Sequence, residues 1–358
     1  MTRYEAVQEL LLDHPRTWLI TGVAGFIGSH LLEKLLRLNQ NVVGLDNFAT
    51  GKRRNLSAVE ARVGRDAFTH FRFIEGDICD AQTCALAMTG IEFVLHEAAL
   101  ASVPRSMADP ARTHAANVDG FVNVLLAARS AGVRRVVYAS SSSVYGDEPS
   151  DLKVEPRTGR PLSPYATSKL VNEIYADTLR RTHGIESVGL RYFNVFGPRQ
   201  DPHGAYAAVI PRWTEQLSSG QPCLVFGDGS ASRDFCFVDN VVQANVLAAC
   251  VPEAANAGGV FNVAYGARTT LRELFSAIRA RVAMLRPSAA DKQLQVEAPR
   301  PGDIPHSLAN IQLARDVLGY QPEYDLAKGL DQTVPFYRKR ASVPSGTTYP
   351  AYSKQEAP

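Results

Sequence analysis

The chain has 358 residues, of which 45% are hydrophobic and 21% charged, and its formal net charge is +2. A chain of this length can bury a large core, and its nearly balanced charge excludes the basic footprint of a nucleic-acid-binding protein and a polybasic membrane segment. No apolar run approaches the roughly 20 residues that cross a bilayer, and the N-terminus lacks the basic and apolar regions of a signal peptide, so we expect a cytoplasmic protein.

A strand, a glycine turn and a helix follow one another near the N-terminus, after a short helix predicted over residues 4–12. The strand covers residues 18–21, and the turn places Gly22, Gly25 and Gly28 three residues apart. Glycines in such a turn let the backbone approach a pyrophosphate, whose charge the following helix N-terminus stabilises. This order of elements therefore predicts a dinucleotide-binding site.

The second predicted strand, residues 42–45, ends at an acidic residue. Asp46 follows Gly28 by 18 residues. A carboxylate there can accept hydrogen bonds from the adenosine ribose hydroxyls and would repel a 2′-phosphate. This favours NAD over NADP, although the basic run at residues 52–54 follows closely.

The same alternation continues, with apolar strands separated by helical segments. Asp77 and Ile78 follow the third strand, where they can meet the edge of an adenine, and Ala98 follows the fourth, where it leaves room for a cofactor. His96 is interpreted as a core residue rather than a ligand. The alternation predicts a doubly wound α/β fold with a parallel, Rossmann-type sheet and an NAD-binding domain over residues 1–193. The further predicted elements are strands at residues 71–74, 93–96, 136–139 and 187–192, and a helix over 111–131 that carries Asn117.

Prolines break the strand–helix rhythm beyond residue 194. Shorter elements predict a smaller α/β substrate domain over residues 194–340, with the chain crossing back to the first domain. Residues 341–358 are rich in Ser, Pro and Thr and are expected to be disordered. The predicted elements of the smaller domain are strands at 223–226 and 234–237 and helices near 239–250 and 270–283.

Tyr165 and Lys169 are the predicted catalytic pair. Pro164 suits a helix start, so the two side chains should lie one turn apart on one helix face. A phenol has a pKa of about 10, and a nearby ammonium group favours its ionised form. A Tyr-x-x-x-Lys spacing alone is commonly a solvated helix face, but here serines 140–143 follow the fifth strand, at the sheet edge where ligands bind.

Together, the glycine turn, the serine run and the Tyr165/Lys169 pair resemble an extended short-chain dehydrogenase/reductase. Within that superfamily the chain is similar to nucleotide-sugar epimerases, most of all to bacterial UDP-N-acetylglucosamine 4-epimerases. The resemblance covers nearly the whole length and is carried by residues 44–51, 102–106, 191–197, 204–211 and 300–303.

The resemblance implies a mechanism in which NAD is regenerated in every cycle. Tyr165 takes the proton from the sugar 4-hydroxyl while hydride leaves C4 for the nicotinamide. Lys169 lowers the pKa of Tyr165 and holds the nicotinamide ribose, and Ser141 hydrogen-bonds the reacting oxygen and relays its proton. The 4-keto sugar then turns over and receives hydride on its other face.

The resemblance also implies the remaining binding residues. Arginines suit the UDP diphosphate because a guanidinium makes paired, charge-assisted hydrogen bonds. The expected cofactor-binding residues are Gly22, Gly25, Phe26, Ile27, Gly28, Asp46, Asn47, Gly51, Asp77, Ile78, Ala98, Asn117, Tyr165, Lys169 and Val195. The expected substrate-binding residues are Ser102, Ser141, Ser142, Ser143, Asn194, Val209, Val225, Phe226, Arg233, Arg300, Asp303 and Ser307.

Three of these serines bear on specificity. Sugar 4,6-dehydratases and related decarboxylases carry acidic residues where Ser142 and Ser143 stand, so elimination chemistry is disfavoured. Ser307 follows Asp303 by four residues, the position that in the family admits or blocks an N-acetyl group, and a serine should admit it. The alternative is that Ser307 is only a loop residue.

Several alternatives stay open at this stage. The enzyme could act on UDP-glucose and UDP-galactose, or accept both kinds of sugar; a reductase that releases its cofactor uses the same Tyr and Lys. A third hypothesis is not an enzyme at all but a non-catalytic NAD-binding sensor or scaffold.

We expect a homodimer by analogy with the family. We expect no metal site, because the five cysteines show no ligand spacing, and no nucleic-acid or membrane partner.

Overall fold

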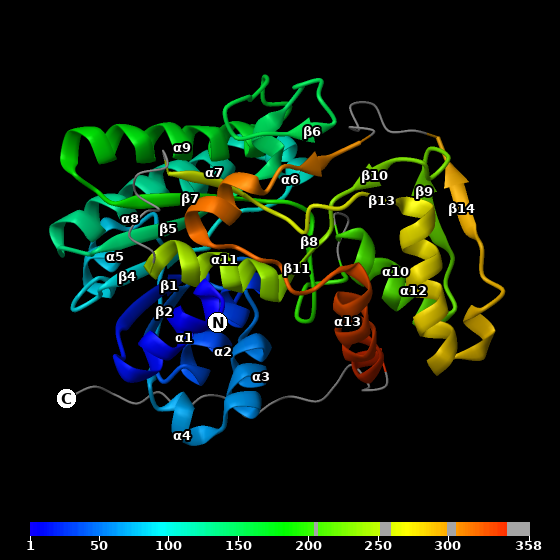
Figure 1. The fold of residues 1–358 in the computed structure, drawn as a ribbon, viewed down its shortest axis with the longest axis horizontal. Helices are drawn as coiled ribbons and strands as arrows, with labels where there is room; N and C mark the ends of the chain where they lie inside the picture. Colours follow the sequence, from blue (N-terminus) through cyan, green and yellow to red (C-terminus); the bar gives the residue numbers. More distant parts are fainter. Residues whose placement is uncertain (204–206, 251–258, 299–305, 342–358) are drawn as a thin grey trace.

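The computed structural model describes residues 1–203, 207–250, 259–298 and 306–341 (Figure 1). Arg300, Asp303 and all but the first residue of the expected disordered tail lie outside these ranges. Among the described residues, no helix is long and apolar enough to span a bilayer, and no cluster of His, Cys, Asp or Glu could hold a metal ion.

A parallel sheet of seven strands forms the centre of the molecule. Its order is β12-β7-β5-β4-β1-β2-β3, so the direction of winding reverses between β1 and β4. Ligands of such sheets bind beyond the carboxyl ends of the strands at this reversal. The prediction of a doubly wound α/β fold is confirmed. In spatial order the strands are Val260–Val263, Ser187–Tyr192, Arg135–Ser141, Phe93–His96, Thr17–Thr21, Asn41–Asp46 and Phe71–Glu75.

Helices cover both faces of this sheet, each through an apolar stripe (Figure 1). The predicted leucines of α2 are buried against it, as are Val7 and Leu11 of the N-terminal helix, whereas Leu10 is exposed. One face carries α5 (Ala81–Ala87), α8 (Gly120–Ser130) and α9 (Pro164–His183), and the other carries α1 (Arg3–Asp13), α2 (Phe26–Arg37), α3 (Arg53–Val63) and α11 (Val238–Cys250).

The sheet is completed by residues that come late in the chain. Strand β12 pairs with β7 at one edge, and α11 packs its buried face on the sheet. A helix near residues 239–250 was predicted, but β12 was not. The chain therefore returns to the large sheet after residue 194.

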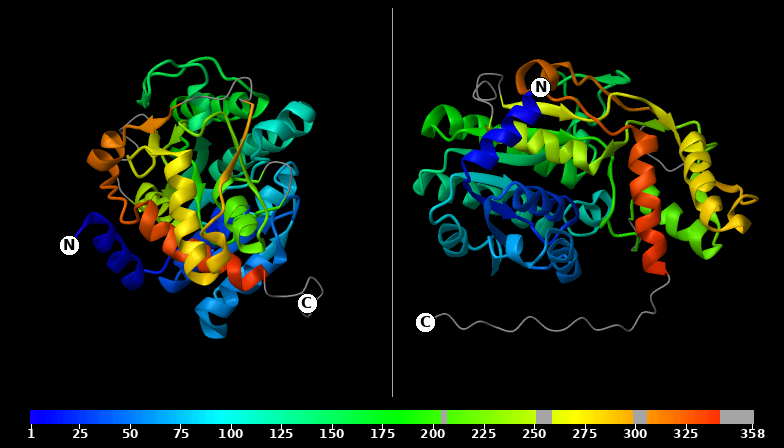
Figure 2. Two further views of the ribbon diagram at one scale, coloured as in Figure 1. Left: turned by 90° about the vertical axis from the view of Figure 1, so that its right-hand side faces the viewer. Right: turned by 60° about the horizontal axis from the view of Figure 1, so that its bottom comes forward.

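The C-terminal lobe has its own apolar core around Trp213, Phe275 and Leu330. Trp213 and Phe275 meet edge to face, with ring centroids 5.8 Å apart. The right view of Figure 2 shows the yellow and red helices of this lobe together at one end of the molecule. The lobe consists of α10 (Val209–Ser219), β9 (Cys223–Phe226), α12 (Leu271–Leu285), β14 (Leu294–Glu297) and α13 (Leu326–Ala341).

Short elements lie between the longer helices and strands. The single helix predicted over residues 111–131 is divided: α7 (Pro110–His114) is followed by a π-helical turn, Ala115–Asp119, and then by α8. The other short elements are α4 (Arg65–Phe68), α6 (Val103–Ala108), the 3₁₀ turns Ser142–Tyr145 and Pro287–Ala289, the π-helical turn Ala314–Leu318, and the strands β6 (Leu152–Lys153), β8 (Val195–Phe196), β10 (Ser232–Arg233), β11 (Cys236–Phe237), β13 (Thr269–Thr270) and β15 (Leu308–Ala309).

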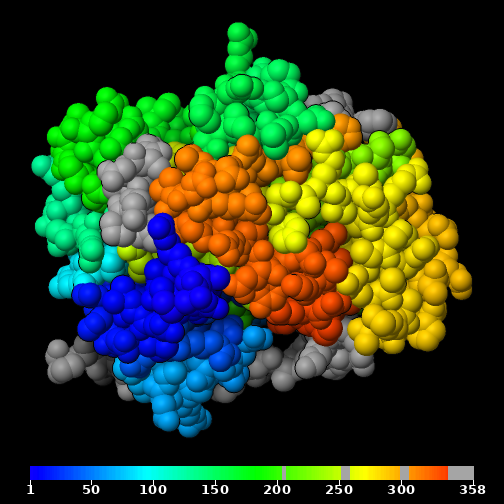
Figure 3. Space-filling view, viewed as in Figure 1, coloured from blue at the N-terminus to red at the C-terminus, as the bar shows by residue number. Residues whose placement is uncertain are grey.

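The N-terminal helix is tied to residues near the other end of the chain. A hydrogen bond of 2.7 Å joins the Arg3 guanidinium to the Val317 carbonyl. Figure 3 shows the blue N-terminal residues against the orange segment that contains Val317.

Candidate active site

The glycine turn between β1 and α2 is closely packed. Gly22 has φ +72°, and a Cβ on it would lie 2.8 Å from the Ala98 nitrogen. A Cβ on Gly28 would lie 2.2 Å from the Gly22 carbonyl oxygen. Because Gly25, the residue before α2, offers no side-chain cap, the N–H groups of the first helical turn, Phe26 to Gly28, are open to an anion. The turn therefore fits a pyrophosphate.

Asp46 lies buried at the end of β2, beside this turn. Its carboxylate accepts the backbone N–H groups of Ala24 at 2.9 Å and Phe48 at 2.7 Å. Burial raises the pKa of Asp46, and these two hydrogen bonds oppose the rise. A Cβ on Gly51 would lie 2.7 Å from Asp46 Oδ1, so only glycine leaves the carboxylate in place.

Asp77 follows the next strand, β3, by two residues and lines a crevice together with Asp46. Asn47 Nδ2 donates to it at 2.8 Å, and the Cys79 N–H donates at 2.8 Å. Burial raises the pKa of Asp77, but these hydrogen bonds outweigh it and the pKa is lowered. The crevice brings together seven of the predicted cofactor residues: Gly22, Gly25, Asp46, Asn47, Asp77, Ile78 and Ala98.

Asn117 lies in the π-helical turn and is buried. Its Oδ1 accepts the Leu100 N–H at 2.8 Å, and its Nδ2 donates to Ser168 Oγ at 3.0 Å. Asn117 thus joins the loop after β4 to the helix that carries Tyr165.

Tyr165 and Lys169 lie in the first turns of α9, which Ser163 caps by accepting the Ala166 N–H at 3.1 Å. Lys169 is buried, and its Nζ donates to the Ala139 carbonyl at 2.8 Å. Burial lowers the pKa of Lys169 to about 8, although the negative charges of Glu97 and Glu173 oppose this.

Ser141 is the third member of the predicted catalytic set. It hydrogen-bonds the Tyr165 side chain, and it also accepts the hydroxyl of Ser143 at 2.9 Å. Burial raises the pKa of Tyr165, the Ser141 hydrogen bond lowers it, and the charge of Glu97 raises it further. The structure brings the three residues together, and because burial is the largest effect, the pKa of Tyr165 lies above its ordinary value.

Glu97, which the sequence analysis did not select, lines the same crevice. Its Oε1 accepts the Tyr192 hydroxyl at 2.7 Å. Burial raises the pKa of Glu97 to about 7, against the lowering effects of the Tyr192 hydrogen bond and Lys169. The sequence feature that could have identified Glu97 is a carboxylate directly after an apolar strand.

A buried ion pair holds α9 against the sheet beneath the catalytic residues. Arg191 donates to both oxygens of Glu173, at 2.9 and 2.8 Å, and Ser140 donates to Glu173 as well. Ser140 directly precedes Ser141, so the pair fixes the strand end that presents Ser141, the predicted catalytic serine. Sequence reasoning missed both charged residues.

The predicted substrate residues fall into two groups. Ser142 and Ser143 adjoin Ser141, and the Ser307 N–H donates to the Ser232 carbonyl at 3.2 Å, next to Arg233. The other predicted substrate residues are dispersed. Ser102 caps α6, Asn194 donates to the Asp234 carbonyl, and Val209 begins α10. Phe226 ends β9, and Val225 is buried in the core of the C-terminal lobe; Val195, a predicted cofactor residue, packs against both cores.

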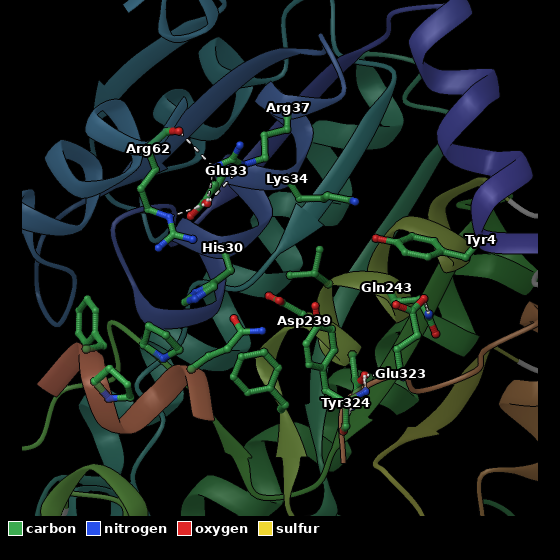
Figure 4. A pocket seen from close by; sticks show the side chains of 17 residues that line it. Tyr4, His30, Glu33, Lys34, Arg37, Arg62, Asp239, Gln243, Glu323 and Tyr324 are labelled. Carbon is green, nitrogen blue, oxygen red and sulfur yellow. Dashed lines mark hydrogen bonds and ion pairs between the residues drawn. The ribbon is translucent and has the colours of Figure 1, made fainter. Parts of the chain in front are cut away.

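A larger cavity, of about 470 Å³, lies elsewhere, among α1, α2, α11 and α13 (Figure 4). None of the predicted site residues lines it. Glu33 on its wall pairs with Arg62 at 2.7 Å and with the buried Arg199 at 2.7 Å. We therefore place the chemistry in the crevice at the sheet edge and not in this cavity.

Residues 18–264 match the NAD dependent epimerase/dehydratase family. The chain belongs to this family. Its members bind NAD, and the glycine turn, open helix N-terminus and Asp46 described above are where the family's cofactor fits.

Known relatives of the family cover almost the whole chain. A UDP-glucose 4-epimerase of Mycolicibacterium smegmatis is 41% identical over 325 residues, which are 90% of this chain and 99% of the relative. A UDP-N-acetylglucosamine 4-epimerase from Methanobrevibacter ruminantium, solved with UDP-N-acetylmuramic acid, is 34% identical with a TM-score of 0.82, covering 91% and 99% of the two chains. A Thermus thermophilus UDP-glucose 4-epimerase, solved with NAD, is 35% identical with a TM-score of 0.76, covering 90% and 99%.

These findings decide part of the sequence predictions. The extended dehydrogenase/reductase family, NAD as the cofactor and an NAD-dependent UDP-sugar 4-epimerase are confirmed. The preferred sugar is not: a relative named for UDP-glucose matches at 41% identity, and one named for UDP-N-acetylglucosamine matches at 34%.

Proposed function

We propose that this UDP-sugar 4-epimerase interconverts UDP-N-acetylglucosamine and UDP-N-acetylgalactosamine. The observation that carries the proposal is Ser307, a small residue whose backbone N–H donates to the Ser232 carbonyl, next to Arg233 in the chain. A small residue at that position leaves space for a sugar N-acetyl group. The Methanobrevibacter ruminantium relative, named for UDP-N-acetylglucosamine, supports the same choice.

The residues of the chain take separate parts in this reaction. Bound NAD supplies the hydride acceptor and a positive charge. Tyr165 removes the proton of the sugar 4-hydroxyl, and Ser141, hydrogen-bonded to Tyr165, steadies the reacting oxygen. Lys169, fixed on the Ala139 carbonyl, keeps a cation near the phenol. Tyr165 returns the proton when the keto sugar has turned over.

The remaining assignments form part of the same proposal. Arg233, and with it Arg300 and Asp303 outside the described residues, would hold the UDP group, and Phe226 and Asn194 would border it. Exposed apolar residues on α8 and α9, namely Leu126, Ile174 and Tyr175, support a homodimer formed through these helices, which light scattering of the purified protein can test. We further propose a cytoplasmic enzyme that supplies precursors of a surface polysaccharide; a deletion strain with unchanged surface glycans would count against that role.

A second candidate is a UDP-glucose/UDP-galactose 4-epimerase or an enzyme that accepts both kinds of sugar. The specific observation in its favour is the 41% identity to the Mycolicibacterium smegmatis UDP-glucose 4-epimerase. A non-catalytic NAD-binding sensor is a third reading, and the assembled Ser141, Tyr165 and Lys169 weigh against it.

The deciding experiment offers UDP-N-acetylglucosamine and UDP-glucose in parallel to the purified protein, without added NAD. We expect the acetylated sugar to turn over faster, and Ser307→Tyr to reduce that turnover at least tenfold, because bulk would fill the acetyl position, while UDP-glucose turnover is kept. Ser307→Ala is the matched control and should retain both activities. Faster use of UDP-glucose by the unmodified enzyme would reject the proposed substrate, and no turnover of either sugar would favour the sensor.

A further inference from the structure

Glu97 is held rigidly at the carboxyl end of β4, on the side of the sheet that faces α11. The Tyr192 hydroxyl donates to its Oε1 at 2.7 Å, and Asn245 Nδ2 of α11 donates to that hydroxyl at 2.8 Å. Tyr192 and Asn245 are both buried. The second carboxylate oxygen makes no hydrogen bond to any described residue, while the side chain lines the cofactor crevice. The carboxylate is therefore fixed from one side only.

The charge of Glu97 acts at the end of this crevice nearest the predicted catalytic pair, which is not itself among the residues that line the crevice. It favours the protonated form of Lys169 and raises the pKa of Tyr165. Tyr165 takes a proton from the same substrate carbinol that gives up hydride, so the nicotinamide must reach this end of the crevice. The nicotinamide ring is a cation when oxidised and neutral when reduced. A carboxylate in this place stabilises the oxidised ring more than the reduced one.

We propose that Glu97 supplies a fixed negative charge that holds bound NAD in its oxidised form between turnovers. In each half-reaction one hydride passes between sugar C4 and the ring, and one proton passes between the sugar oxygen and Tyr165. A charge that disfavours the reduced ring drives the hydride back to the keto sugar and limits release of that sugar from a reduced enzyme. The inference rests on NAD as the cofactor and not on which UDP-sugar is bound.

The effect of Glu97 on the bound ring should be stronger at alkaline pH than at acidic pH. The groups that face Glu97 are Lys169 and Tyr165 of α9 and Tyr192 of β7, and of these only Lys169 carries a charge near neutral pH. Burial places the pKa of Glu97 at about 7 without cofactor, and a cationic ring beside it would lower that value. The charge is present at alkaline pH and is lost as the pH falls through this range.

The test measures how readily enzyme-bound NAD accepts hydride from dimethylamine–borane, a small neutral donor, with no sugar present. Hydride passes from boron to the ring, boron takes hydroxide from water, the proton left over is released to the buffer, and absorbance at 340 nm reports the product. We expect Glu97→Gln to be reduced roughly tenfold faster than the unmodified holoenzyme at pH 9, since one charge at an effective dielectric constant of about 20 acts over several Å with at least that effect. The two rates should converge at about pH 5. Glu9→Gln, which removes a charge from the exposed face of α1, should change nothing.

Two further outcomes separate charge from structure. Tyr192→Phe keeps the carboxylate but removes the hydrogen bond that lowers its pKa, so the pH at which the rate changes should move upward. Equal rates for Glu97→Gln and the unmodified enzyme at pH 9, or a difference that is the same at every pH, would overturn the proposal. If Glu97→Gln does not retain NAD, the test rests on how the reduction rate of Tyr192→Phe changes with pH. A pH profile that is not shifted from that of the unmodified enzyme would reject the proposed role of Glu97. Because no sugar is used, failure of the proposed substrate would leave this assay unaffected.

Discussion

Removing the buried charge of Glu173 should destabilise the protein far more than removing a surface charge. The Glu173 and Arg191 side chains are 7% and 5% exposed and share two short hydrogen bonds. Glu173→Gln would leave the Arg191 guanidinium buried without its counter-charge, at a cost of about 3–5 kcal/mol in the free energy of unfolding. The matched control is Glu75→Gln, whose partner Arg53 is 60% exposed; this pair should contribute at most about 1 kcal/mol.

The assay is urea-induced unfolding of the NAD-bound protein, followed by circular dichroism and by the fluorescence of the two buried tryptophans, Trp18 and Trp213. A double replacement, Glu173→Met with Arg191→Met, removes both charges and should cost less than the sum of the single changes, because no unpaired charge remains. A loss below about 1 kcal/mol for Glu173→Gln, or an additive double variant, would refute the reasoning that this pair is desolvated and coupled.

Two further predictions concern the active site. Tyr165→Phe should lower kcat by roughly 10²- to 10⁴-fold, the usual contribution of a general base, while the purified protein keeps its NAD; undiminished turnover would exclude Tyr165 as that base. Gly28→Ala should lower the amount of NAD that co-purifies, measured after acid release, because its Cβ would lie 2.2 Å from the Gly22 carbonyl oxygen and displace the turn. A fully loaded Gly28→Ala protein would show that the turn does not hold the cofactor.

Local patterns predicted the nucleotide-binding half well because its strands are continuous apolar runs. Strand β12 was not predicted, because its four residues include Asn262 and lie beyond the regular alternation of strands and helices. That amide is satisfied only by distant partners: it accepts the Tyr145 hydroxyl at 2.6 Å and donates to the Lys153 carbonyl at 3.1 Å. A buried polar residue of this kind resembles a loop residue until the fold is known.

The site shows the same division between local and distant information. Gly22 and Asp46 belong to one strand–helix–strand unit, β1-α2-β2, so spacing alone placed them in a shared crevice. Glu97 depends on a tyrosine 95 residues away, and the π-helical turn around Asn117 is fixed by bonds to Leu100 and to Ser168. Neither a helical period nor a motif contains these partners, so sequence reasoning could not assign them.

The late arrival of β12 and α11 has a consequence for how the protein is made. During synthesis, the first 190 or so residues leave the ribosome with one sheet edge unpaired and part of one sheet face uncovered. The segment that closes the edge and covers this part of the face ends only at Val263. Exposed edges and apolar faces invite aggregation. The nascent chain is therefore prone to aggregation until Val263 has been synthesised. During that time its exposed surface would bind chaperones rather than its own cofactor.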